Sequence, residues 1–191
     1  DSASAQVKFF IYRPADFTQE QRLLIEKGSG LVEREVMSYD EESLQEAVGE
    51  LKYLLSESDR RLLESLNDEG KRRFIVQFWN RNDPDPSTPI NEFKVLYEQR
   101  KELANQKYGF WDKPGWKTDR GRVLMLYGEP DDIEYHTHDP GTRSYEVWFY
   151  DGLEGGVQFI FVDRNNFGDY RLVHSNKKGE LTVPIGSKKR R

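Results

Sequence analysis

The sequence predicts an α+β fold, with a helical N-terminal layer packed against a small antiparallel β-meander. Over roughly the first hundred residues, apolar residues recur at the spacing of an amphipathic helix. Beyond about residue 120, they come in short runs between turn residues, as in consecutive antiparallel strands. Aromatic residues make up 13% of the 191-residue chain, which is enough to fill a packed core and argues against disorder.

Apolar stripes predict the helices. They cover residues 44–55, 62–66, 74–79 and 93–104. A shorter helix is expected to begin at the capping box Thr18-x-x-Gln21 and to end near Gly28. The last helix is expected to begin with Thr88 as its N-cap and Pro89 in the first helical position, where the missing N–H costs nothing. It should end at Gly109.

Short runs of aromatic and β-branched residues predict the strands. Three of them, 145–150, 157–162 and 170–174, are joined by short loops and form the meander. A buried apolar run, 123–127, precedes them and is closed by a turn that begins at Gly128. A separate strand is predicted at 7–12. It either belongs to an upstream domain or pairs with the C-terminal sheet, and the sequence leaves both open.

Composition excludes several functions. The net charge of −5 argues against nucleic-acid binding, because phosphate contacts require a basic surplus. No apolar run reaches the roughly 20 residues that a membrane span requires. The absence of Cys excludes thiol catalysis, thiolate metal sites and disulfides. The motifs typical of hydrolases, nucleotide-binding proteins and zinc proteases are also missing.

One combination of motifs is specific. It consists of Gly115-Trp116-x-Thr118-Asp119, the upstream stretch Phe78-Trp79-x-x-x-x-Asp83-Pro84-x-Pro86-x-Thr88-x-x-Asn91-Glu92-Phe93, and the downstream segments 145–148 and 167–170. Over roughly residues 42–175 the chain thereby resembles the bacterial GWxTD-domain family. The resemblance implies an exported protein of the periplasm or cell envelope, longer than this chain, with no established enzymatic activity or cofactor.

The expected organisation has four parts. Residues 1–13 hold the strand of an upstream domain, 14–82 a helical segment, 83–175 the GWxTD region with its long helix and meander, and 176–191 a basic mobile tail. The tail carries Lys and Arg on an acidic chain, so contact with anionic envelope components is one interpretation and a solvated terminus is the other.

Two histidines and one turn are the candidates for metal binding. His136 and His138 are two residues apart, so both imidazoles face one side of an extended segment. They supply only part of a zinc ligand set, and the alternative is a polar loop between Tyr127 and Tyr145 with two exposed histidines. The segment 163–168 begins like a calcium loop but lacks the required ligands, which favours a hairpin turn with Asx hydrogen bonds. We therefore expect no cofactor.

The signature itself allows two interpretations. In the structural one, Trp116 fills the seam between the long helix and the meander, Thr118 or Asp119 caps the next element, and Arg120 pairs with an acid such as Asp83 or Glu92. In the functional one, Trp111 and Trp116 are exposed and bind a partner or a glycan. The structural interpretation is preferred, because an aromatic residue beside a Gly-Pro turn usually packs.

Acid–base catalysis is the runner-up hypothesis. Asp83, Glu92 and Asp119, with Asn91, would form a carboxylate set in a cleft near the Pro-rich segment and the signature loop. Acids and an amide in a first helical turn also serve capping and the helix dipole. We expect a non-enzymatic module of the cell envelope that binds another protein or braces other domains of its parent chain. The alternative is a hydrolase or glycan-binding domain.

Overall fold

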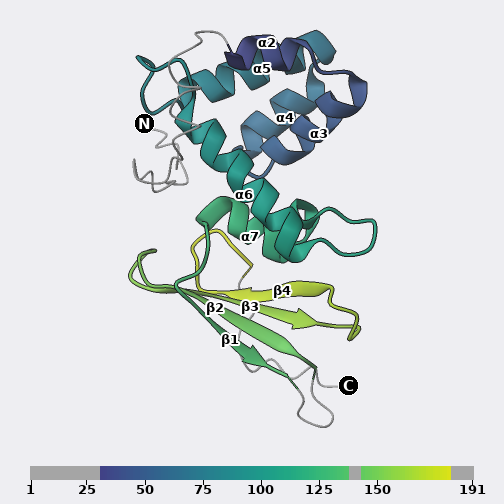
Figure 1. The fold of residues 1–191 in the computed structure, drawn as a ribbon, viewed down its shortest axis with the longest axis vertical. Helices are drawn as coiled ribbons and strands as arrows, with labels where there is room; N and C mark the ends of the chain where they lie inside the picture. The colour runs from purple at the N-terminus through teal and green to yellow at the C-terminus, as the bar shows by residue number, and fades with distance from the viewer. Residues whose placement is uncertain (1–30, 138–142, 182–191) are drawn as a thin grey trace. The chain divides into compact units, whose positions relative to one another are not determined.

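The computed structural model describes residues 31–137 and 143–181. Within them helices are followed by one four-stranded antiparallel sheet of strand order β1-β2-β3-β4 (Figure 1), which confirms the α+β class. The chain divides into two compact units, Asp1–Gln99 and Arg100–Arg191, each taken by itself below. The four-part division drawn from the sequence stays a prediction. The strand at 7–12 and the helix at 18–28 lie outside the described residues.

The first unit is helical. Its helices are α2 (Leu31–Met37), α3 (Glu41–Leu51), α4 (Glu57–Ser65), α5 (Asp68–Arg81) and the first half of α6 (Glu92–Tyr108). Each of α3, α4 and α5 begins at a side chain that accepts a hydrogen bond from a backbone N–H of the first turn: Asp40, Ser56 and Asn67. The predicted stripes correspond to α3–α6. Helix α2 was missed because it buries only Val36 and so has no periodic pattern.

Aromatic rings form much of the core of this unit. Trp79 of α5, which is 4% exposed, packs against Phe93 and Tyr97 of α6, with ring centroids 5.6 Å and 5.5 Å away. The Tyr97 hydroxyl donates to the backbone carbonyl of Glu50 at 3.1 Å, so this fully buried ring satisfies its polar atom on α3. The apolar face of the first part of α6 therefore joins α5 to α3.

The start of α6 differs from the prediction. The helix begins at Glu92, and the Asn91 side chain accepts from the Lys94 backbone N–H at 2.8 Å, so Asn91 and not Thr88 is the cap. A contact distant in sequence explains the difference: the same amide donates to the carbonyl of Trp79 at 2.5 Å. Asn91 therefore caps α6 and holds the end of α5 with one buried side chain.

The second unit places helices on a sheet. It contains the end of α6, the 3-10 helix η2 (Gly115–Lys117), α7 (Asp119–Tyr127) and the strands β1 (Asp132–His136), β2 (Tyr145–Tyr150), β3 (Val157–Asp163) and β4 (Tyr170–Ser175). The three predicted strands are confirmed as β2–β4. The predicted polar loop instead holds a further strand, β1, which pairs Ile133 with Trp148 of β2. The buried run 123–127 is the end of α7.

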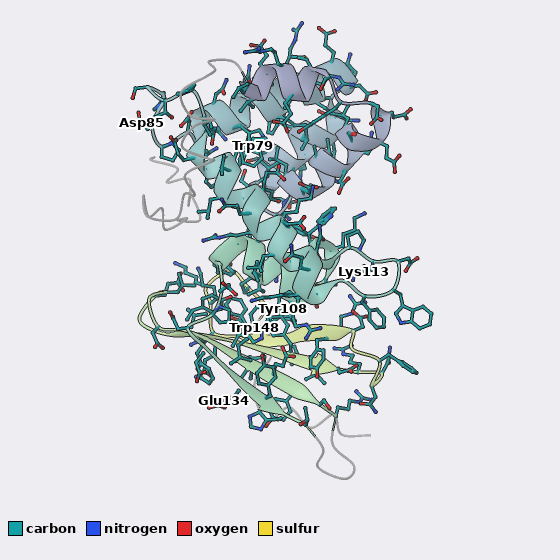
Figure 2. All side chains as sticks on the ribbon, viewed as in Figure 1. Trp79, Asp85, Tyr108, Lys113, Glu134 and Trp148 are labelled. Atoms are coloured by element: carbon teal, nitrogen blue, oxygen red, sulfur yellow. The ribbon has the colours of Figure 1, made fainter. Side chains whose placement is uncertain are left out.

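The core of this unit lies between the sheet and α7 (Figure 1). Alternate residues of β2 and β3 face the helices, and Trp148, Phe159 and Phe161 are fully buried there. The ring of Tyr108, at the end of α6, lies 5.3 Å from that of Trp148 (Figure 2). This packing places the segment 109–119, which carries the signature, beside the sheet.

The beginning of the predicted tail is held in place. Glu180 forms a bidentate ion pair with Arg122 of α7, at 3.0 Å and 2.8 Å, and accepts from the Tyr127 hydroxyl at 2.6 Å. Burial and this hydrogen bond raise the pKa of Tyr127 well above its ordinary value. Glu180 is thus joined to α7 within the second unit, and 182–191 lie outside the described residues, so the basic mobile tail at 176–191 stays a prediction.

Candidate functional site

Two glycines allow the signature loop to approach its neighbours closely. A Cβ at Gly115 would lie 1.8 Å from the carbonyl oxygen of Ala104, on the last turns of α6. A Cβ at Gly121 would lie 1.9 Å from the carbonyl oxygen of Gly115. Such distances are far below van der Waals contact, so only glycine fits either position. The backbone of the signature is thus in direct contact with α6 on one side and with α7 on the other.

Thr118 and Asp119 of the signature begin α7. The Thr118 hydroxyl donates to the carbonyl of Gly115 at 2.7 Å and accepts from the Gly121 N–H at 3.0 Å, which confirms that Thr118 is an N-cap. The Asp119 carboxylate accepts from the Leu172 N–H of β4 at 2.8 Å. The two side chains join the loop, the helix and the sheet, so both are used in contacts within the unit.

Arg120 is held between two aromatic rings. Its guanidinium carbon lies 4.9 Å from the ring centroid of Tyr108 and 4.2 Å from that of Tyr170. It donates to Glu146 of β2 at 2.9 Å and to the carbonyl of Gly168 at 3.1 Å. The predicted pairing of Arg120 with Asp83 or Glu92 is therefore wrong. Its partner is an acid of the sheet, which the chain folding brings to it and which sequence spacing could not indicate.

The tryptophans of this region differ in exposure. Trp116 is only 3% exposed, and its backbone N–H donates to the Asn105 side chain of α6 at 3.2 Å. Trp111 is 90% exposed. Trp116 is therefore buried beside α6, as the structural interpretation expects, whereas Trp111 has the exposure that a binding residue requires.

The loop that presents Trp111 is well defined. Phe110 and Lys113 exchange two backbone hydrogen bonds, at 3.0 Å and 2.8 Å, at the base of the loop (Figure 2 labels Lys113). Between them Trp111 has a φ of 52°, a left-handed conformation that a tryptophan adopts only when its surroundings impose it. The indole is therefore held outward by the backbone.

Phe110 lies near Trp111, and the exposed Phe167 precedes Gly168, which the Phe110 ring approaches. The Phe110 ring centroid is 6.2 Å from that of Trp111, and its edge lies 3.7 Å from the position that a Cβ on Gly168 would take. Phe167, next to Gly168, is 73% exposed. Phe110, Trp111 and Phe167 are named here the aromatic patch. The sequence indicated Trp111 but not Phe167, because the Phe110 ring and the segment at Gly168 come together only in the folded chain.

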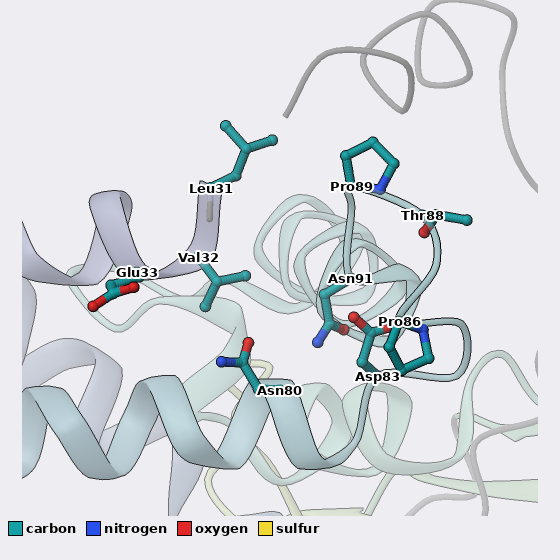
Figure 3. Close-up of a pocket in the computed structure, with 9 residues that line it drawn as sticks. All are labelled: Leu31, Val32, Glu33, Asn80, Asp83, Pro86, Thr88, Pro89 and Asn91. Carbon is teal, nitrogen blue, oxygen red and sulfur yellow. The ribbon is translucent and has the colours of Figure 1, made fainter. Parts of the chain in front are cut away.

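The Pro-rich segment lines a pocket in the first unit. The pocket has a volume of about 250 Å³. Asp83, Pro86 and Asn91 lie together on one side of it, opposite Val32 of α2 and Asn80 of α5 (Figure 3). Its wall thus combines apolar side chains with two carboxyls, two amides and a hydroxyl. No signal in the sequence could have placed α2 opposite the Pro-rich segment.

Two acids meet beside this pocket. Glu92 is 3% exposed, and its Oε1 accepts from the Thr88 hydroxyl at 2.6 Å. Asp83 accepts from the Asp85 N–H at 3.1 Å. Burial raises the pKa of the Asp83 carboxyl above its ordinary value, and the negative charge of the nearby Glu92 raises it further. Asp83 and Glu92 thus form a pair of acids that lack a cationic partner among the described residues.

The residues of the runner-up hypothesis fall into two groups. Asp83, Asn91 and Glu92 gather in the first unit, and Asp119 and Arg120 belong to the second. Asp119 is bonded to β4 and Arg120 to Glu146, so neither is an unpaired group. The hypothesis of a hydrolase or glycan-binding cleft stays a prediction, with its local support limited to the pocket of the first unit.

Of the candidates for metal binding, His136 and the turn at 163–168 lie in the described residues. His136 stacks on Tyr145 with ring centroids 4.2 Å apart, and His138 lies outside the described residues. Asp163 accepts from the N–H groups of Asn165 and Gly168, at 3.3 Å and 2.8 Å, which confirms the hairpin turn with Asx hydrogen bonds. Over 31–137 and 143–181, no group of three or more acids or histidines is arranged to hold a metal ion.

Comparison with known proteins gives one match. The family model described as the GWxTD domain matches residues 22–190, which is nearly the whole chain. No curated protein and no solved structure matches the chain.

Proposed function

The chain belongs to the GWxTD-domain family, and we propose that it is a non-enzymatic module of the bacterial cell envelope. In this proposal it is part of a larger exported protein and binds another protein, or another domain of the same protein, through the aromatic patch. The observation that carries the proposal is the 90% exposure of Trp111 on a loop that fixes its backbone. Among the helices of the described segments, none is long and apolar enough to cross a membrane.

The chemistry of the patch supports a protein partner. Tryptophan and other large aromatic residues dominate the binding energy of protein interfaces, because they bury much area and lose little side-chain entropy. A loop that is already ordered adds affinity, since its conformational cost is met on folding and not on binding. Contacts of the signature stabilise the second unit, which carries the patch. They are made by Thr118, Asp119 and Arg120.

We expect Trp111→Asn to remove partner binding and leave the fold intact. Asn tolerates the left-handed conformation of this position, so the substitution removes the indole without straining the loop. As an interface residue of this kind contributes about 2 kcal/mol or more, binding should weaken by roughly 30-fold. The measurement is crosslinking of the full-length protein in bacterial cells, with quantification of the recovered partner in the envelope fraction.

The matched control is Leu62→Ala, which changes another exposed apolar side chain, 49% exposed, in the first unit. It should recover the partner at the level of the unchanged protein. If the Trp111→Asn protein recovers as much of the partner as the unchanged protein does, the aromatic patch does not bind that partner. Recovery of the protein in the cytoplasmic fraction would contradict the proposed location.

A further inference from the structure

We propose that the loop between α5 and α6 is a binding site for calcium, formed by oxygen atoms of residues 83–92. The site would be independent of the aromatic patch and lies in the other unit. Its oxygens come from the carboxylates of Asp83 and Glu92, the hydroxyl of Thr88 and the backbone carbonyls of Asp85 and Ile90.

The first argument is a buried carboxylate oxygen with no donor. Glu92 is 3% exposed, and its Oε2 accepts no hydrogen bond within the described residues. The neighbouring polar side chain is Asp83, and two carboxylates cannot form a hydrogen bond without a proton between them. A buried carboxylate oxygen that lacks a donor is costly, and a cation beside it removes the cost.

The second argument is the shortage of protons around Thr88. The Thr88 oxygen lies 2.6 Å from Glu92 Oε1, 2.8 Å from the Ile90 carbonyl and 3.1 Å from the Asp85 carbonyl. The Asp85 carbonyl also accepts from the Thr88 backbone N–H at 3.0 Å, so the hydroxyl proton is left to satisfy either Glu92 Oε1 or the Ile90 carbonyl, but not both. Oxygen atoms of several residues therefore converge on a small volume with too few donors, which is the environment of a hard cation.

The ligand types indicate which cation fits. Carboxylates, a hydroxyl and backbone carbonyls are all oxygen ligands, and the set contains none of the nitrogen or sulfur ligands that zinc prefers. Calcium accepts irregular sets of six to eight oxygens that include backbone carbonyls, whereas magnesium demands a near-ideal octahedron. Asp83 and Asp85 occupy the first and third positions of the loop, as in a helix–loop–helix calcium site. Glu92 comes at the tenth position and not the twelfth, so the loop is not an EF-hand.

The site adjoins the pocket of the first unit. Asp83 and Thr88 line that pocket, so solvent reaches the cluster from one side (Figure 3). When a protein supplies only some of the calcium ligands, the site needs an entry path for the ion and room for water molecules as the other ligands. The Asn91 side chain holds the end of the loop by donating to the Trp79 carbonyl and accepting from the Lys94 N–H, and it is not one of the proposed ligands.

The test measures calcium binding by calorimetry and thermal unfolding, on the full chain freed of metal with EDTA. We expect a dissociation constant of about 10⁻⁴–10⁻³ M, the range of weak extracellular sites. A concentration of 10 mM CaCl₂ is about tenfold or more above these dissociation constants. At this concentration the thermal unfolding midpoint should rise by several degrees. The same concentration of MgCl₂ should give at most a small shift.

Glu92→Gln separates the proposal from a structural role. The neutral amide removes the buried charge, so the variant in EDTA should unfold at or above the temperature of the unchanged protein. It should nevertheless bind calcium at least tenfold more weakly and lose the calcium-induced shift. The control Glu57→Gln, which changes an exposed acid of α4, should keep the calcium affinity and the calcium-induced shift of the unchanged protein. If Glu92→Gln fails to fold, Asp83→Asn provides the same comparison.

The outcomes decide the proposal. Binding that is lost in Glu92→Gln or Asp83→Asn and kept in Glu57→Gln supports it. No heat and no shift at 10 mM CaCl₂ would overturn it. A calcium shift that persists in both variants of the cluster would overturn it too, because the ion would lie elsewhere.

Discussion

Gly115→Ala should prevent the second unit from folding. A Cβ at this position would lie 1.8 Å from the Ala104 carbonyl oxygen, 2.5 Å from its carbon and 2.7 Å from the Asn105 Cα, and all three are backbone atoms of α6. No side-chain rotation relieves such a contact, so either the loop or the helix must move. We expect a loss of more than about 4 kcal/mol of unfolding free energy. Denaturant unfolding, followed by the near-ultraviolet signal of the buried tryptophans, measures it.

Gly152→Ala is the matched control for this prediction. Nothing lies within 4 Å of a Cβ at Gly152, in the loop after β2, and its φ is not in the left-handed region. The same chemical change should therefore alter the unfolding free energy by no more than about 0.5 kcal/mol. If Gly115→Ala were as harmless as Gly152→Ala, the close approach of the signature to α6 would not exist in solution.

Arg120→Met should cost about 3–5 kcal/mol of unfolding free energy, because it leaves a buried acid without its cation. Glu146 is 6% exposed, and without Arg120 it keeps, among the described residues, the hydrogen bond from the Trp148 indole at 3.0 Å. Methionine keeps much of the packing between Tyr108 and Tyr170, so the loss reports mainly the charge. Chemical denaturation of the variant measures the effect.

Two variants make this prediction specific. Adding Glu146→Gln to Arg120→Met should recover part of the loss, since the unpaired buried charge is removed. Arg61→Met, which breaks an exposed pair with Glu57, should change the unfolding free energy by no more than about 1 kcal/mol. If Arg120→Met were as mild as Arg61→Met, the stabilising role assigned to Arg120 would be wrong.

Local patterns made most of the fold predictable. Helices α3 to α6 and strands β2 to β4 follow from apolar periodicity, which reflects burial of one face of each element. Strand β1 is not predictable from the sequence, because its polar residues Asp132, Glu134 and His136 are equally typical of a loop. Its pairing with β2 is what makes it a strand. Helix α7 corresponds to the buried run 123–127, and the sequence alone does not assign its type, because so short an apolar segment fits a helix and a strand equally well.

The site was predictable only in part, because its decisive contacts join residues distant in sequence. Thr118 was recognisable as a cap, since capping depends on neighbouring residues. The pairing of Arg120 with Glu146 and the bond from Asn91 to Trp79 span many residues and depend on the folded chain. The burial of Trp116 was expected from the Gly-Pro turn beside it, whereas the exposure of Trp111 depends on packing that no sequence pattern indicated.

The central claim is that the signature residues hold the second unit together, while the exposed Trp111 is available to a partner. The most direct test is the thermal unfolding midpoint of Trp116→Ala, measured beside that of Trp111→Asn. Removing a buried tryptophan costs about 3–5 kcal/mol, so the midpoint of Trp116→Ala should fall by roughly 10 °C or more. Trp111→Asn should unfold within about 2 °C of the unchanged protein, as expected for an exposed site. A Trp116→Ala protein that unfolds at the original temperature would contradict the claim.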